Sequence, residues 1–103
     1  MINKALKLIR QYHQLKQTEL AEKLETSKSY LSEIESGKKP VSFELIEKYS
    51  KIFEIPASSL VFFSESLSGK KGMTEKFRSA FSGKILKILE WFVNKDEPKK
   101  TKT

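Results

Sequence analysis

The sequence predicts an all-α protein of five short helices followed by a longer amphipathic helix. Apolar residues recur every three or four positions along most of the 103-residue chain, which is the spacing of one helical face. Residues that start or stop helices stand between these runs. Ser27 and Ser42 can act as N-caps, Gly37 can end a helix at positive φ, and Pro40 prevents that helix from resuming.

Short helices are expected at about 3–14, 17–24, 28–36 and 57–63. A further helix is expected to start after Ser42 and to bury Leu45, Ile46, Tyr49 and Phe53. Asn3 is a plausible N-cap for the first helix, which presents Leu6 and Ile9 on its apolar side. Pro56 precedes the fifth helix, which carries Leu60 and Phe63. These lengths and spacings predict one small all-α domain in the first sixty or so residues.

The stretch from Gln17 to Gly37 is the most informative part of this domain. Two short amphipathic helices follow one another there, and their helical phase breaks between Glu25 and Ser29. Two helices joined in this way can pack nearly perpendicular to each other as a helix-turn-helix. The second helix then stands free to enter the major groove of DNA.

Residues from about Leu6 to Phe63 resemble the helix-turn-helix domain of the Cro/phage-repressor family, also called the XRE family. The residues that carry the resemblance are Gln17, Leu20, Ala21, Leu24, Ser27, Ile34, Glu35, Gly37 and Pro40, followed by the apolar positions of two further helices. The resemblance implies a five-helix phage-repressor-like domain that binds double-stranded DNA. It covers somewhat over half of the chain.

The resemblance implies that side chains at the start of the third helix meet base edges. The matching positions here are Ser27, Lys28, Ser29, Ser32 and Glu33. Lys28 can donate to guanine, and Glu33 can accept from the N4 amine of cytosine.

Phosphate contacts are expected at Lys16, Gln17, Ser36, Lys38 and Lys39. Gln17 begins the second helix, where free N–H groups favour an anion, and the two adjacent lysines follow the third helix.

Two structural expectations also follow from the resemblance. Family members often pair an arginine of the first helix with a glutamate near the end of the third, and Arg10 and Glu35 match these residues. We expect this pair to be partly exposed and to contribute little energy. The turn between the second and third helices often holds glycine in the family. Glu25 or Thr26 stands there instead, and Glu25 would be strained at positive φ.

Beyond the domain at 1–63, the sequence predicts a linker at 64–73, an amphipathic helix at 74–94 and a disordered tail at 95–103. The apolar stripe of this helix is expected to form a homodimer interface through Phe77, Phe81, Ile85, Ile88, Leu89 and Phe92. Two alternatives are that the helix folds back onto the first domain, or that it binds another protein or a membrane surface. Lys84, Lys87 and Glu90 argue against a transmembrane segment.

Composition supports a DNA-binding protein and excludes several kinds of site. The net charge is +7, and most of it lies beyond residue 63: residues 1–63 hold ten Lys or Arg against eight Asp or Glu, and residues 64–103 hold ten against five. There is no cysteine, so disulfides and thiolate metal sites are excluded, and we expect a cytoplasmic protein. His13 has no partners at metal-ligand spacing. We expect no catalytic residue, metal or cofactor.

These observations lead to one hypothesis and two alternatives. The hypothesis is a sequence-specific transcriptional regulator, a homodimeric repressor that reads a palindromic operator through the third helix. The first alternative is the antitoxin of a toxin–antitoxin pair, whose C-terminal region binds the toxin. The second is a protein- or membrane-interaction module that has lost specific DNA binding.

Overall fold

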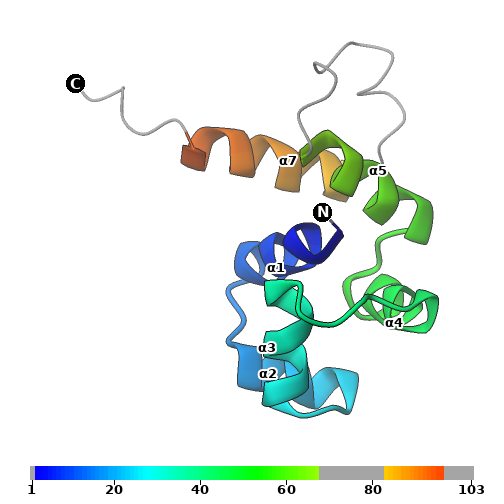
Figure 1. The fold of residues 1–103 in the computed structure, drawn as a ribbon. Coiled ribbons are helices and arrows are strands. Elements are labelled where there is room, and N and C mark those ends of the chain that lie inside the picture. The colour runs from blue at the N-terminus through cyan, green and yellow to red at the C-terminus, as the bar shows by residue number, and fades with distance from the viewer. Residues whose placement is uncertain (1, 68–82, 97–103) are drawn as a thin grey trace.

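The computed structural model describes residues 2–67 and 83–96, and every regular element in this part of the chain is a helix (Figure 1). In chain order the helices are α1 (Ile2–Tyr12), α2 (Gln17–Leu24), α3 (Lys28–Ser36), α4 (Phe43–Phe53), α5 (Ala57–Leu67) and α7 (Gly83–Asp96). The all-α class is confirmed, α2 and α3 have the predicted bounds, and α4 begins directly after Ser42 as predicted.

The expected caps explain these bounds. The Ser27 side chain accepts from the Tyr30 backbone N–H at 3.0 Å, and the Ser42 side chain accepts from the Leu45 N–H at 3.1 Å. Each bond satisfies a donor that would otherwise lack a partner at the start of a helix. Gly37 ends α3 at a φ of +86°, in the left-handed region that glycine occupies without strain.

The first helix differs from the prediction at both ends. It begins at Ile2, so Asn3 lies inside the first turn and is not the N-cap. It ends at Tyr12, because Gln14 turns the chain at a φ of +56°. Because Asn3 lies inside the first turn, its side chain reaches the end of α3, where it donates to the Glu35 backbone carbonyl.

Helix α1 is the central element of the core. Ala5, Leu6 and Ile9 are completely buried. Helix α1 packs against α3 on one side and against α5 and α7 on the other, as Figure 1 shows. The two ends of the molecule are therefore joined through one helix.

The C-terminal helix α7 folds back onto the first domain. Ile85 and Ile88 have no exposed surface and Leu89 is 4% exposed, all within a single chain. Helix α7 contacts α1 and α5, and the Trp91 ring lies edge-on to Tyr12 with the ring centroids 5.5 Å apart. The expectation that these three residues form a dimer interface is therefore corrected, and the fold-back alternative describes α7.

The physical reason is that α1 and α5 leave apolar surface that α7 covers. Burial within one chain needs no association of two molecules and so avoids the entropic cost of binding. Phe92 is half-buried in the same contact, with the Lys4 ammonium 6.0 Å from its ring centroid. Phe77 and Phe81 lie outside the described residues.

The predicted linker is also corrected at its start. Helix α5 continues through Leu67, so 64–67 are helical. The helix continues beyond the predicted end at Phe63 because Ser64 is buried and Leu67 packs against the core. At the other end, α7 reaches Asp96, so 95–96 are helical and do not belong to a disordered tail. The predictions for 68–82 and 97–103 lie outside the described residues.

Candidate nucleic-acid interface

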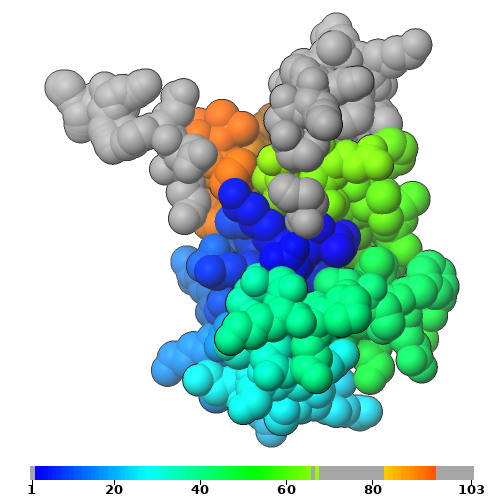
Figure 2. All heavy atoms as spheres, in the orientation of Figure 1, coloured from blue at the N-terminus to red at the C-terminus, as the bar shows by residue number. Residues whose placement is uncertain are grey.

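The exposed side of α3 collects the residues expected to read bases. Four of them, Ser27, Lys28, Ser29 and Ser32, are exposed, and Glu33 is half-exposed. The opposite side of the helix is buried through Leu31, Ile34 and Glu35. Figure 2 shows α2 and α3, in cyan, at the surface of the molecule, at the end remote from the orange α7.

The turn that orients α3 is fixed by burial on both helices. Leu20, Leu24 and Ile34 are at most 2% exposed, so the inner faces of α2 and α3 pack together. Between the helices, Glu25 has a φ of +60° and a ψ of +46°. The expectation of a left-handed residue at this turn is met, although the residue is not glycine.

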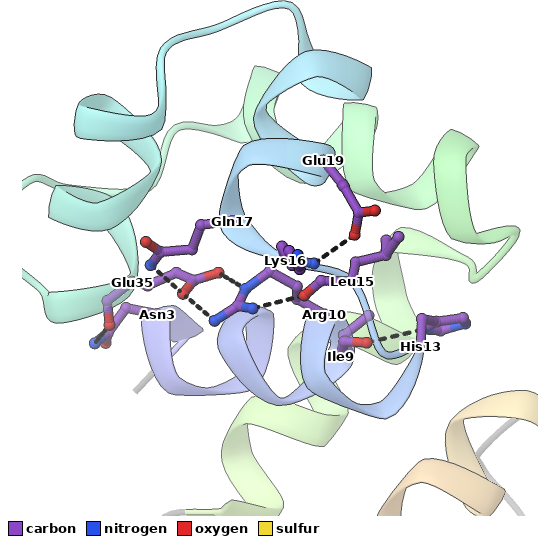
Figure 3. A network of polar contacts seen from close by, with 9 residues as sticks. All are labelled: Asn3, Ile9, Arg10, His13, Leu15, Lys16, Gln17, Glu19 and Glu35. Carbon is purple, nitrogen blue, oxygen red and sulfur yellow. Dashed lines mark hydrogen bonds and ion pairs between the residues drawn. The ribbon is translucent and has the colours of Figure 1, made fainter.

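A buried ion pair ties α1 to α3 (Figure 3). The Arg10 Nε donates to Glu35 Oε2 at 2.7 Å, and its Nη2 donates to Oε1 at 3.0 Å. The two side chains are 12% and 2% exposed. The predicted pairing of Arg10 with Glu35 is observed, and the Glu35 carboxylate is almost fully removed from water. The expectation that the pair contributes little net energy stays a prediction.

Gln17, the first residue of α2, joins this network through its side-chain amide. Its Nε2 donates to Glu35 Oε1 at 3.0 Å. The adjacent Lys16 has an exposed side chain, while its backbone N–H donates to the Glu19 carboxylate at 2.8 Å. The structure thus brings Gln17 to α3 and leaves the Lys16 ammonium accessible.

Asn3 belongs to the same network, and the sequence analysis missed this role. Its Nδ2 donates to the Glu35 backbone carbonyl at 3.2 Å. A Cβ built on Gly37 would lie 3.2 Å from the same nitrogen, so α1 passes close to the end of α3. The only signal in the sequence was a polar residue two helical turns, seven positions, before Arg10, which is not distinctive.

Two exposed lysines follow α3. The backbone N–H groups of Lys38 and Lys39 both donate to the Glu33 carbonyl, at 2.9 and 3.2 Å, and close the end of the helix. The Lys39 ammonium lies 3.9 Å from the Glu33 carboxylate, with both side chains about half exposed. The hydroxyl of Ser36 donates to the same carbonyl at 3.2 Å. These backbone bonds hold two positive charges beside the exposed side of α3.

The contacts of His13 are those of a packed structural residue. The His13 ring lies against Phe53 with the ring centroids 4.5 Å apart, and its Nδ1 lies 2.8 Å from the Ile9 carbonyl oxygen. Across 2–67 and 83–96, no group of three metal-ligating side chains comes together. In the same ranges, no helix has the length and hydropathy of a membrane span.

Comparison with known families decides what this arrangement is. A helix-turn-helix family model matches residues 6–60, from α1 to the start of α5. The chain belongs to the helix-turn-helix family. The resemblance to the Cro/phage-repressor (XRE) type is confirmed, and this helix-turn-helix protein is a DNA-binding regulator of that type. Comparisons with curated proteins and with solved structures gave no match.

Proposed function

We propose that the helix-turn-helix protein is a sequence-specific transcriptional repressor that places α3 in the major groove. The observation that carries this proposal is the exposed, mixed-polarity side of α3 held rigidly by the buried Arg10–Glu35 pair. A recognition helix whose base-facing side chains start from a fixed backbone loses less entropy on binding.

Positively charged side chains on both sides of α3 would contact the phosphates of the two DNA strands. The exposed ammonium groups of Lys16, Lys38 and Lys39 lie at the N-terminal end of α2 and just after α3. Such contacts position the protein without reading sequence. Gln17 contributes through Glu35, by orienting α3, and the exposed Ser36 hydroxyl lies at the C-terminal end of α3.

The repressor hypothesis includes two copies on a palindromic operator. One recognition helix reads only a few base pairs, so two chains on half-sites about 34 Å apart would read a longer sequence. Repression would follow from steric exclusion of RNA polymerase at an overlapping promoter. Because Ile85, Ile88 and Leu89 are buried within one chain, the contact between copies would use other surfaces.

The same burial weakens the two alternatives. A toxin or a membrane would need the apolar side of α7, and that side already packs on α1 and α5. The repressor proposal requires no such exposure.

Selection from a random duplex library tests the proposal, followed by binding and in vitro transcription with the enriched DNA. We expect an enriched palindrome and a salt dependence that weakens when Lys38 or Lys39 is changed to alanine, by about one unit of slope for each lost phosphate contact. Transcription from a promoter overlapping the palindrome should fall. Lys51→Ala, at an exposed lysine of α4, is the matched control and should leave the slope unchanged. Recovery of no motif would refute sequence-specific reading.

A further inference from the structure

The side chains on the exposed side of α3 differ in how strictly they constrain a base. Serine hydroxyls both donate and accept, so Ser29 and Ser32 suit many base edges. Lys28 can only donate and the ionised Glu33 can only accept. These two residues therefore impose the strictest polarity requirements on the DNA.

Lys28 and Glu33 stand five positions apart in α3, which is about 7.5 Å along a helix axis. Successive base pairs are about 3.4 Å apart, so the two side chains are about two base-pair steps from each other. We therefore expect Lys28 and Glu33 to contact different base pairs, each corresponding to one position (column) of the selected binding motif.

The Glu33 side chain is half-exposed on a part of α3 whose backbone is firmly bonded. Its backbone carbonyl accepts from both N–H groups that close α3, so its backbone is fixed, while 44% of its side chain is exposed. The Lys39 ammonium at 3.9 Å offsets part of the repulsion that an acidic side chain meets between two phosphate backbones.

We propose that Glu33 selects a cytosine in each half-site and that Lys28 selects a guanine about two steps away, an inference that rests on the proposed function. Cytosine presents only the N4 amine donor in the major groove. Guanine O6 and N7 and thymine O4 are acceptors, so they would repel the carboxylate. Adenine offers its N6 amine beside the acceptor N7, which makes it the second choice.

A Glu33→Gln variant provides the sharpest test. A glutamine pairs well with adenine N6 and N7, so the selected motif should change from cytosine to adenine in one column only. For wild type, replacing that cytosine by thymine should weaken binding by about five- to a hundredfold. Lys39→Met should weaken binding to all sequences alike and keep the cytosine column. Glu47→Gln removes an exposed acidic charge on α4 and should change neither the binding affinity nor the selected motif.

Three outcomes separate this inference from the proposed function. If wild type selects a motif and Glu33→Gln leaves every column unchanged, the inference is wrong and the repressor proposal stands. If Glu33→Gln strengthens binding equally to all sequences, Glu33 faces phosphate, and the inference is again wrong. If wild type selects no motif, the proposed function itself fails.

Discussion

At the scale of single residues, Glu35 is the side chain on which the orientation of α3 depends most. Arg10 and Gln17 donate to its carboxylate, and Asn3 donates to its backbone carbonyl. The carboxylate is 2% exposed, so water cannot replace a lost partner. Three side chains from α1 and α2 thus converge on one residue of α3, and the loss of one partner should be costly.

Removal of Arg10 tests this dependence. Arg10→Met leaves a buried carboxylate without its ionic partner and should lower the free energy of unfolding by about 3–5 kcal/mol. The double variant Arg10→Met with Glu35→Gln removes the charge as well and should recover part of the loss. Urea denaturation measures both. Equal losses for the single and double variants would show that the pair carries no coupling.

Tyr49 links stability to alkaline pH. Burial raises the pKa of its hydroxyl above the ordinary value of 10.0, and the nearby Glu35 charge raises it further. Above pH 10 the unfolded chain loses this proton while the folded chain keeps it. The unfolded state then binds fewer protons, so the Tyr49 contribution is complete below pH 10 and falls as pH rises, by about 1.4 kcal/mol per pH unit.

Tyr49→Phe removes this contribution. Urea denaturation between pH 9 and 11.5 should show a shallower loss of stability for the variant than for wild type, because the other titrating groups are common to both. Parallel curves would mean that Tyr49 ionises equally in the folded and unfolded chains.

At the scale of helices, three ends turn through residues other than glycine. Gln14, Glu25 and Glu54 have φ values of +56°, +60° and +56°. A basic side chain donates to a carbonyl beside each turn: Arg10 to Leu15, Lys48 to Leu24 and Lys84 to Phe53. The Leu24 and Phe53 carbonyls belong to helix ends that leave them open, and the Leu15 carbonyl lies in the connection between α1 and α2. The three bonds offset part of the left-handed strain.

Glycine at these turns should stabilise the protein. Glu25→Gly and Glu54→Gly each relieve left-handed strain of about 1 kcal/mol and should raise the Tm by a few degrees. Glu47→Gly, in the interior of α4, is the control and should lower the Tm, because glycine weakens a helix interior by about 1 kcal/mol. An unchanged or lower Tm for both turn variants would contradict the strain argument.

Helix positions and the exposed side of α3 followed from the sequence because they depend on local signals. Ser27, Ser42 and Gly37 mark helix ends in any context. The partner of α7 did not follow, because an apolar stripe on Ile85 and Ile88 is compatible with a second copy, another protein or the chain's own core. The contact of Asn3 with Glu35 was also hidden, since the two residues are distant in sequence and meet only through packing.

At the scale of the whole molecule, α1 lies between the end formed by α2 and α3 and the end completed by α7. Helix α7 adds Ile85, Ile88 and Leu89 to the one described core, and its Lys84 ammonium donates to the Phe53 carbonyl at 2.6 Å. The C-terminal helix is therefore a structural part of the domain.

A pair of matched variants tests this role of α7. Ile88→Ala removes a fully buried side chain and should cost about 2–5 kcal/mol of unfolding free energy. Val93→Ala, at a residue that is 49% exposed, should change stability by less than about 0.5 kcal/mol. Fluorescence of Trp91, the single tryptophan, should change in the same transition as circular dichroism. Two equally small effects would mean that α7 is not part of the core.

The most direct test of DNA reading by α3 is fluorescence anisotropy on the selected duplex. It compares wild type with Lys28→Ala and with the control Lys51→Ala. We predict that Lys28→Ala costs about 1–3 kcal/mol of binding free energy and relaxes the preference at one position, while Lys51→Ala binds like wild type. Wild-type affinity and unchanged sequence preference for Lys28→Ala would show that α3 does not read bases as described.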